Sequence, residues 1–282
     1  MADNSRDFTS VYQTDDRADF WAREKLRRQE RSGAATETLI KAADLHIGDR
    51  VLEVAAGTGD LAVTVAQSVG SSGHVVAVDS SPKMLAHAGK AAREAGLSNI
   101  ETRVMNAEAL EVEENSFNDV ICRMALMLFG NPLTALTEMH KVVKPGGKVA
   151  VMVWSSADKN PFHGLPLQIA RRIGNIPAPG PDIPGLFALG DSERLINLFR
   201  KVGFRSVSSQ SSAHHRKYVS LQDAITLIKS SGGAAALQNV MVNLSIADQE
   251  KAWAEITEEL TQFHGPNGFE APGEVLIGVG TK

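Results

Sequence analysis

Short apolar runs alternate with longer stretches of helical periodicity through the first half of this sequence. The runs are rich in valine, leucine and isoleucine, and in the stretches between them apolar positions recur every third or fourth residue. Strands that alternate with helices at this spacing predict a parallel sheet covered by helices on both faces. The predicted strands are Arg50–Ala56, His74–Asp79, Ile100–Met105, Asp119–Arg123 and Lys148–Trp154.

The pattern changes on both sides of these strands, and it divides the chain into six parts. They are a helical lid, a sheet core, a proline- and glycine-rich cap insertion, a core helix and strand, a helical cap and a last core strand, with bounds 1–48, 49–154, 155–190, 191–218, 219–270 and 271–282. Within the lid, residues 16–45 predict two helices. The other elements expected are helices at 82–95, 132–143, 165–173 and 192–202, an extended segment at 205–218, several helices over 221–263 and a strand from Glu274.

Composition narrows the classes of function. Hydrophobic residues make up 43% of the 282 residues and charged residues 22%, as in an ordinary globular protein. Lysine and arginine total 29 against 33 acids, so the net charge of -4 argues against nucleic acid as a partner. The first residues lack the pattern of a signal peptide, and no apolar stretch approaches the roughly 20 residues of a membrane span. We therefore expect a cytoplasmic protein.

Cys122 is the only cysteine, which excludes a disulfide within one chain and a cluster of thiolates around a metal. It lies in an apolar run, so we expect a buried, inert thiol. We predict no metal site.

A glycine turn follows the first predicted strand. Gly57-Thr-Gly59-Asp-Leu-Ala62 fits the pattern G-x-G-x-x-G/A between a strand and a helix, where glycines allow a ligand close to the backbone. Asp79 ends the second strand, 79 − 59 = 20 residues after Gly59, where a carboxylate can accept both hydroxyls of a ribose. The two features in register predict a nucleoside ligand, although either alone is compatible with a structural turn.

Glu53 helps to choose between two nucleotide classes. It places a carboxylate in the first strand, directly before the turn, where it would repel a pyrophosphate and attract a cationic amino-acid group. That charge favours S-adenosylmethionine (SAM) over NAD. If Glu53 instead accepts hydrogen bonds from loop N–H groups, its position is compatible with either cofactor. An NAD(P)-dependent oxidoreductase therefore remains an alternative.

Five motifs in order carry a family resemblance. They are Val51-Leu-Glu-Val-Ala-Ala-Gly-Thr-Gly-Asp60, Val76-Ala-Val-Asp79, Asn106-Ala-Glu-Ala-Leu110, Asp119-Val-Ile-Cys-Arg123 and Lys144-Pro-Gly-Gly147. Together they resemble class I SAM-dependent methyltransferases, close to the small-molecule subgroup of ubiquinone and menaquinone C-methyltransferases. The resemblance spans about residues 48–154. It implies a Rossmann-like, doubly wound sheet of seven mostly parallel strands, with an antiparallel last strand and a helical cap.

The resemblance also implies which positions hold the cofactor, whose product is S-adenosylhomocysteine (SAH). Those expected beside the methionine moiety and the ribose are Glu53, Ala55, Gly57, Gly59, Asp79, Ser80, Cys122 and Arg123. Those expected beside the adenine are Met84, Asn106, Ala107 and Glu108. Ala56 departs from the glycine or cysteine usual in this turn. Arg123 has an equal alternative, a salt bridge with a neighbouring acid.

The acceptor is expected under the cap. The segments 155–189 and 221–263 should lie over the carboxyl ends of the strands, where open α/β sheets bind ligands. Their aliphatic content predicts a small, partly apolar acceptor, and we expect O- or C-methylation, in that order. We expect the protein to be a monomer or a homodimer. A SAM-binding protein without transfer activity is a further alternative.

We assign no catalytic residue from the sequence. A general base would be a histidine, and His163, His214 and His215 lie in the variable part, although each is more often structural. His140 is interpreted as a surface or interface residue. The aromatic side chains that could contact a sulfonium or wall an apolar acceptor are Tyr12, Trp21, Trp154 and Phe162.

Overall fold

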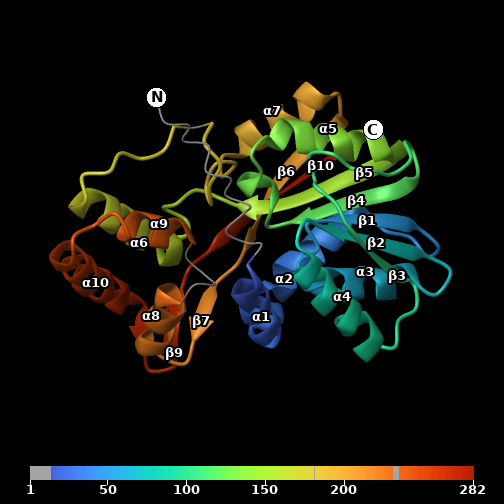
Figure 1. Ribbon diagram of the computed structural model, residues 1–282. Coiled ribbons are helices and arrows are strands. Elements are labelled where there is room, and N and C mark those ends of the chain that lie inside the picture. The colour runs from blue at the N-terminus through green and yellow to red at the C-terminus, as the bar shows by residue number, and fades with distance from the viewer. Residues whose placement is uncertain (1–13, 181, 231–234) are drawn as a thin grey trace.

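A seven-stranded sheet forms the centre of the computed structural model, which describes residues 14–180, 182–230 and 235–282 (Figure 1). Its strand order is β3-β2-β1-β4-β5-β10-β6. The bounds are β1 Arg50–Val54, β2 His74–Asp79, β3 Ile100–Val104, β4 Phe117–Arg123, β5 Val143–Trp154, β6 Arg205–Ala213 and β10 Glu274–Thr281. The predicted core strands are thus confirmed. Two of them begin earlier than expected, because β4 starts at Phe117 and pairs there with Val143 of β5.

Strand direction divides the sheet into two parts. The strands from β3 to β5 are parallel, and β10 runs antiparallel to both of its neighbours, β5 and β6. This confirms the predicted fold class, a mostly parallel sheet whose last strand in the chain is antiparallel. The carboxyl ends of the parallel strands meet at one edge, and the glycine turn follows β1 there.

Helices cover both faces of the sheet (Figure 1). On one face lie α2 (Lys25–Ala43), α3 (Asp60–Val69) and α4 (Pro82–Glu94); on the other lie α5 (Pro132–Val142) and α7 (Ser192–Val202). The start of α4 is as predicted, since the Oγ of Ser81 accepts a hydrogen bond from the backbone N–H of Met84 at 3.2 Å and Pro82 is the first helical residue.

The first helix, α1 (Asp15–Arg23), lies between the sheet and the cap (Figure 1). The two helices predicted over residues 16–45 are present as α1 and α2. The carboxylate Oδ1 of Asp19 is 2.9 Å from Nε2 of His87 and 3.6 Å from Nζ of Lys83, both on α4. Tyr12, which the sequence suggested as a possible aromatic residue of the site, lies outside the described residues.

The cap is a separate group of helices beside the sheet (Figure 1). It contains α6 (Pro161–Ile173), α8 (Leu221–Lys229), α9 (Ala235–Met241), α10 (Ile246–Leu260), and a small antiparallel sheet of β7 (Arg216–Tyr218), β9 (Gly268–Ala271) and β8 (His264–Gly265). The described residues also include the short 3-10 turns η2 (Leu126–Leu128) and η3 (Thr261–Phe263).

The small sheet was not predicted. The sequence suggested one extended segment over 205–218, whereas the structure ends β6 at Ala213 and starts β7 of the other sheet at Arg216. The two residues between them, His214 and His215, carry the chain from the sheet core to the cap. A local pattern does not show such a change of sheet, because pairing with β9 depends on residues some fifty positions later.

Each part has its own apolar core. One cluster fills the space between the large sheet and its helices, and a second packs α6, α8, α9, α10 and β9 together. Leu186 and Phe187, in the loop after α6, pack against both clusters. In the ranges that the structure describes, no helix is both long and apolar enough to cross a membrane.

Candidate functional site

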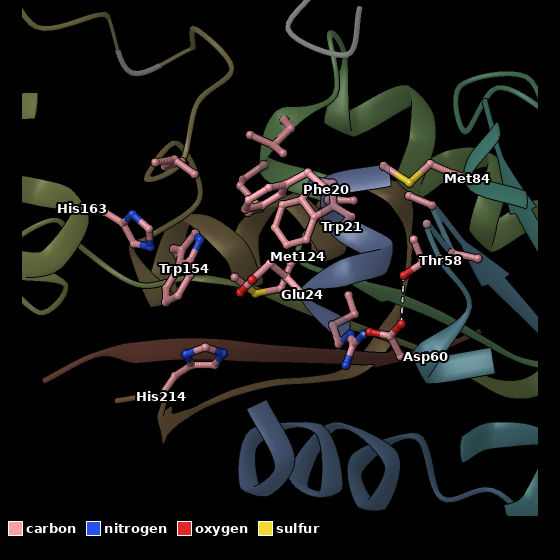
Figure 2. A pocket seen from close by; sticks show the side chains of 18 of the residues that line it. Phe20, Trp21, Glu24, Thr58, Asp60, Met84, Met124, Trp154, His163 and His214 are labelled. Carbon is pink, nitrogen blue, oxygen red and sulfur yellow. Dashed lines mark hydrogen bonds and ion pairs between the residues drawn. The ribbon is translucent and has the colours of Figure 1, made fainter. Parts of the chain in front are cut away.

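A pocket of about 270 Å³ opens at the carboxyl ends of the strands, between the sheet and the cap (Figure 2). The glycine turn and the ends of β2, β4 and β5 form one side of its wall, while α6, β7 and α8 form the other. Phe20 and Trp21 of α1 also line it. Three parts of the chain that are distant in sequence therefore share one cavity.

The two glycines of the turn have different tasks. Both have positive φ, +55° at Gly57 and +79° at Gly59, which few other residues adopt without strain. A Cβ atom at Gly59 would lie 2.7 Å from the Cβ of Ala88, so this glycine lets α3 approach α4. A Cβ at Gly57 would meet nothing within 4 Å. Gly57 thus leaves space on the pocket wall, and Gly59 serves packing.

Asp79 ties the end of β2 to this turn. Its Oδ2 accepts a hydrogen bond from the N–H of Gly57 at 2.9 Å, and its Oδ1 accepts one from the N–H of Ser81 at 2.9 Å. Burial raises the pKa of this carboxyl, and the backbone N–H donors oppose that rise. The side chain lies on the pocket wall together with Ser80 and Met84. An acceptor of hydrogen bonds is therefore fixed beside the turn, as a ribose site requires.

Glu53 is the fourth of the five residues of β1 and does not line the pocket. Its side chain is only 2% exposed, and its buried Oε2 accepts no hydrogen bond from the part of the chain that the structure describes. Burial raises the pKa of this carboxyl to about 8, with Arg123 opposing the rise. At neutral pH this carboxyl keeps its proton in the ligand-free protein, and a cationic group beside it would favour the ionised form. The carboxyl groups of Asp79 and Glu53 thus fit the ribose and the amino-acid end of SAM.

Arg123 combines the two interpretations that the sequence left open. Its Nη2 is 3.4 Å from Oδ2 of Asp60, and its Nη1 donates to Oγ1 of Thr36 at 3.1 Å. It also lines the pocket. Asp60 accepts a further hydrogen bond from the hydroxyl of Thr58 at 2.9 Å, as Figure 2 shows. The ion pair fixes Arg123 at the wall without removing it from the site.

The predicted cofactor residues fall into two groups. Those on the pocket wall are Ala55, Gly57, Asp79, Ser80, Met84 and Arg123. Those set back from the wall are Glu53, Gly59, Asn106, Ala107, Glu108 and Cys122. Ala56, the departure from the usual turn residue, also lines the pocket. The backbone N–H of Ala56 donates to the carbonyl of Val78 at 2.9 Å, which holds the turn against β2.

The turn after β3 makes its own hydrogen bonds. Oδ1 of Asn106 accepts from the N–H of Glu108, and Oε1 of Glu108 accepts from the N–H of Asn131, both at 2.9 Å. Glu108 thus holds this turn to the start of α5. Cys122 is buried, as predicted, and burial raises the pKa of its thiol to about 12.

The four histidines singled out from the sequence differ in whether they line the pocket. His163 and His214 line the pocket on either side of Trp154, with ring centres 5.1 and 4.9 Å from that indole (Figure 2). His215 instead pairs with Glu270 at 2.9 Å and does not line the pocket. His140 is half-buried against Phe204, with ring centres 4.7 Å apart, and burial lowers its pKa. Only the first two histidines are placed to meet an acceptor.

The cap side of the pocket is mainly aromatic and aliphatic. Phe162 and Tyr218 stack with ring centres 5.1 Å apart at an interplanar angle of 24°, and Trp154 closes the end of β5. Arg216 stands among these rings. Sequence reasoning missed Phe20, Arg216 and Tyr218 because none belongs to a motif and each reaches the pocket only through long-range packing. Residues 14–180, 182–230 and 235–282 contain no group of three potential metal ligands.

Known proteins are similar to this chain both in sequence and in fold. The sequence model of the ubiE/COQ5 methyltransferase family matches residues 34–169. The ubiquinone/menaquinone biosynthesis C-methyltransferase UbiE of Blochmanniella floridana is 32% identical over 184 residues, which are 60% of this chain and 70% of that protein. The demethylmenaquinone methyltransferase of Oceanobacillus iheyensis is 37% identical over 110 residues, 39% of this chain and 46% of that protein.

Solved structures show the same fold at lower sequence identity. The YcgJ protein of Bacillus subtilis aligns with a TM-score of 0.59 at 19% identity, over 88% of this chain and 97% of that one. Phosphoethanolamine N-methyltransferase 2 of Haemonchus contortus, solved with S-adenosyl-L-methionine, aligns with a TM-score of 0.58 at 16% identity, over 99% of this chain and 60% of that one.

Proposed function

This chain belongs to the ubiE/COQ5 methyltransferase family, and on that premise we propose that it transfers a methyl group to a ring carbon of a small, partly apolar acceptor. Family membership makes it a SAM-dependent methyltransferase and sets aside the oxidoreductase and the non-catalytic alternatives. The acceptor and the target atom are the proposal.

On the sheet side, we assign the cofactor to the wall around the glycine turn. Asp79 would accept the ribose hydroxyls, Gly57 would leave room for the backbone approach, and Glu53 would face the ammonium group. Met84 would pack on the adenine. SAM, when bound, supplies an electrophilic methyl group on a sulfonium. The protein then has to hold the acceptor atom in line with that methyl and exclude water.

One observation carries the proposal for the acceptor: the pocket continues from Asp79 to the rings of Trp154, Phe162 and Tyr218 without leaving the cavity. Flat apolar walls suit a planar ring. Phe20 and Trp21 of α1 also line the cavity, so the lid would exclude water from the reaction and would have to move to admit ligands.

Kinship supports carbon as the target atom. The relatives from Blochmanniella floridana and Coxiella burnetii, 32% and 30% identical, are both named C-methyltransferases of ubiquinone and menaquinone biosynthesis. A hydroxylated ring places electron density on the carbon beside its hydroxyl, and this carbon would form the new bond to the methyl. The sulfur–methyl bond would break with release of SAH, and the methylated carbon would then lose its proton to restore the aromatic ring. We therefore favour carbon over the O-methylation that the sequence alone placed first.

The test uses two matched acceptors, 1,4-naphthalenediol and 2,3-dimethyl-1,4-naphthalenediol, both kept reduced and incubated with SAM. Both carry free hydroxyls, but only the first has free ring carbons beside them. We expect methylation of the first alone, read by mass spectrometry and by the position of the new methyl in NMR spectra. Asp79→Ala is the control, because it should lose transfer to the first compound.

Two results would count against this proposal. Equal methylation of both diols would assign the methyl to oxygen. No transfer to either diol, in a protein that binds SAH, would contradict a small hydroxylated ring as the acceptor.

A further inference from the structure

A cation stands inside the aromatic half of the pocket. Arg216 of β7 has its guanidinium carbon 4.7 Å from the ring centre of Trp154 and 5.8 Å from that of Phe162. Aromatic faces attract a cation, and they do so more strongly where water is excluded. All three side chains line the pocket. The positive charge is therefore held at the wall where the acceptor is expected.

A histidine fixes the orientation of this guanidinium. Nη2 of Arg216 lies 2.8 Å from Nε2 of His163, on α6. Arginine keeps its protons in proteins and can only donate, so Nε2 of His163 must be the acceptor. His163 is then neutral, with its proton on Nδ1. Because Nε2 is engaged in this way, we do not assign His163 the role of general base.

The pairing of β7 with β9 decides which side chains face the pocket. Along β7, Arg216 and Tyr218 line the cavity, whereas Lys217 points the other way and pairs with Glu270 of β9 at 3.1 Å. Successive residues of a strand face opposite sides, so this register places one of the two neighbouring cations inside the pocket and the other in solvent. The inner position is a product of the fold of the cap.

We infer that Arg216 binds an anionic oxygen on the acceptor, with His163 as its positioning residue. This inference rests on the proposed function and names the class of acceptor: a planar ring bearing a carboxylate or an ionised hydroxyl. A charge-assisted hydrogen bond to a guanidinium is about twice as strong as a neutral one, and it strengthens further in apolar surroundings. Arg216 therefore selects charged acceptors over neutral ones of the same shape.

Calorimetric titration of the full chain, saturated with SAH, tests this selectivity with two pairs of probes. The first pair is 2-naphthoate and 2-naphthalenemethanol, and the second is 4-nitrophenolate and 4-nitroanisole in mildly alkaline buffer. We expect roughly tenfold tighter binding of the anion in at least one pair. The pair that shows it identifies the source of the anionic oxygen, a carboxylate or a ring hydroxyl.

Matched variants locate the effect. Arg216→Gln should abolish the preference for the anion while neutral probes and SAH bind as before. Lys217→Gln removes the same charge from the adjacent position of β7. It should change neither the preference for the anion nor the binding of SAH. His163→Leu should weaken the preference, and His163→Gln should restore most of it, because the amide oxygen of glutamine can accept from Arg216 in place of Nε2. SAH binding reports that each variant is folded.

Three results would overturn the inference. The first is equal affinity for anion and neutral probe in the unaltered protein. The second is that Arg216→Gln loses affinity equally for the anionic and the neutral probe while it still binds SAH, which would make Arg216 a structural residue. The third is that no aromatic probe binds the SAH complex, which would also contradict the proposed small, partly apolar acceptor, whereas the first two leave that proposal standing.

Discussion

The two sides of the pocket are constructed in different ways. The sheet side comes largely from one continuous stretch, from β1 through the glycine turn to the start of α4. The cap side combines α6 with β7 and α8, which follow it in the chain only after α7 and β6. The family match covers residues 34–169 and therefore ends before β7 and α8. The sheet side therefore lies within the matched region, and the cap side lies within it only as far as α6.

The packing follows the same division. The sheet and the cap each have a buried apolar cluster, and Leu186 and Phe187 pack against both. If the two clusters are largely independent, changes in the sheet should affect both ligands, whereas changes in the cap should affect the acceptor first. The predictions below test this asymmetry.

The largest effect is expected at the glycine turn. Gly59→Ala would place a Cβ 2.7 Å from the Cβ of Ala88 and would force a non-glycine residue to φ +79°. Overpacking and backbone strain together should lower the free energy of unfolding by roughly 4 kcal/mol. Urea unfolding measures the loss, and SAH titration should show that binding is lost as well.

Gly57→Ala is the matched control for this prediction. Its Cβ would meet nothing within 4 Å, so only the positive φ is penalised, at about 1 kcal/mol. The variant should fold and yet bind SAH more weakly, because its methyl group projects into the space we assign to the cofactor. Equal destabilisation by the two substitutions would contradict the separate tasks given to these glycines.

The same contrast between the two sides of the pocket explains which site residues can be predicted from the sequence. The turn at Gly57 and the carboxylate of Asp79 are local signals, and strand-turn-helix periodicity is enough to place them. Arg216 has no such signal, since it enters the pocket only because β7 pairs with β9. The small sheet and the lining by Phe20 depend on long-range packing, which a single sequence does not reveal.

The second prediction compares one substitution in both clusters. Ile256 of α10 and Ile121 of β4 are fully buried, the first in the cap and the second in the sheet. Replacing either by alanine should cost roughly 3 kcal/mol. Ile256→Ala should reduce hydrogen-exchange protection in α6 and α10, leave that of β1 unchanged and leave SAH affinity within about twofold. Ile121→Ala should reduce both protection of β1 and SAH binding.

Loss of protection throughout the molecule in Ile256→Ala would contradict the comparison. It would mean that the contacts of Leu186 and Phe187 make the sheet and the cap one cooperative unit, and acceptor specificity could then not change without altering the cofactor site.

A smaller effect than that of the isoleucine substitutions is expected at the buried carboxyl of Glu53. Burial raises its pKa in the folded protein to about 8 from an ordinary value of 4.5. Between pH 6 and 8 the folded state therefore keeps a proton that the unfolded state has already released. A rise in pH then favours unfolding, and this group should cost about 2 kcal/mol across that interval. Glu53→Gln carries no titrating proton and should remove this slope.

Urea unfolding of the ligand-free protein at pH 6, 7 and 8 measures the slope in both forms. Asp119, whose pKa burial raises to about 6, is present in both and contributes equally to each profile. At pH 8 the variant should be the more stable protein and the weaker binder of SAM, because the amide cannot pair with an ammonium group. Parallel profiles would mean that Glu53 is not the titrating group. A variant that gained stability without losing SAM affinity would show that this carboxylate does not hold the cofactor, and that the sheet side owes its binding to the turn and Asp79 alone.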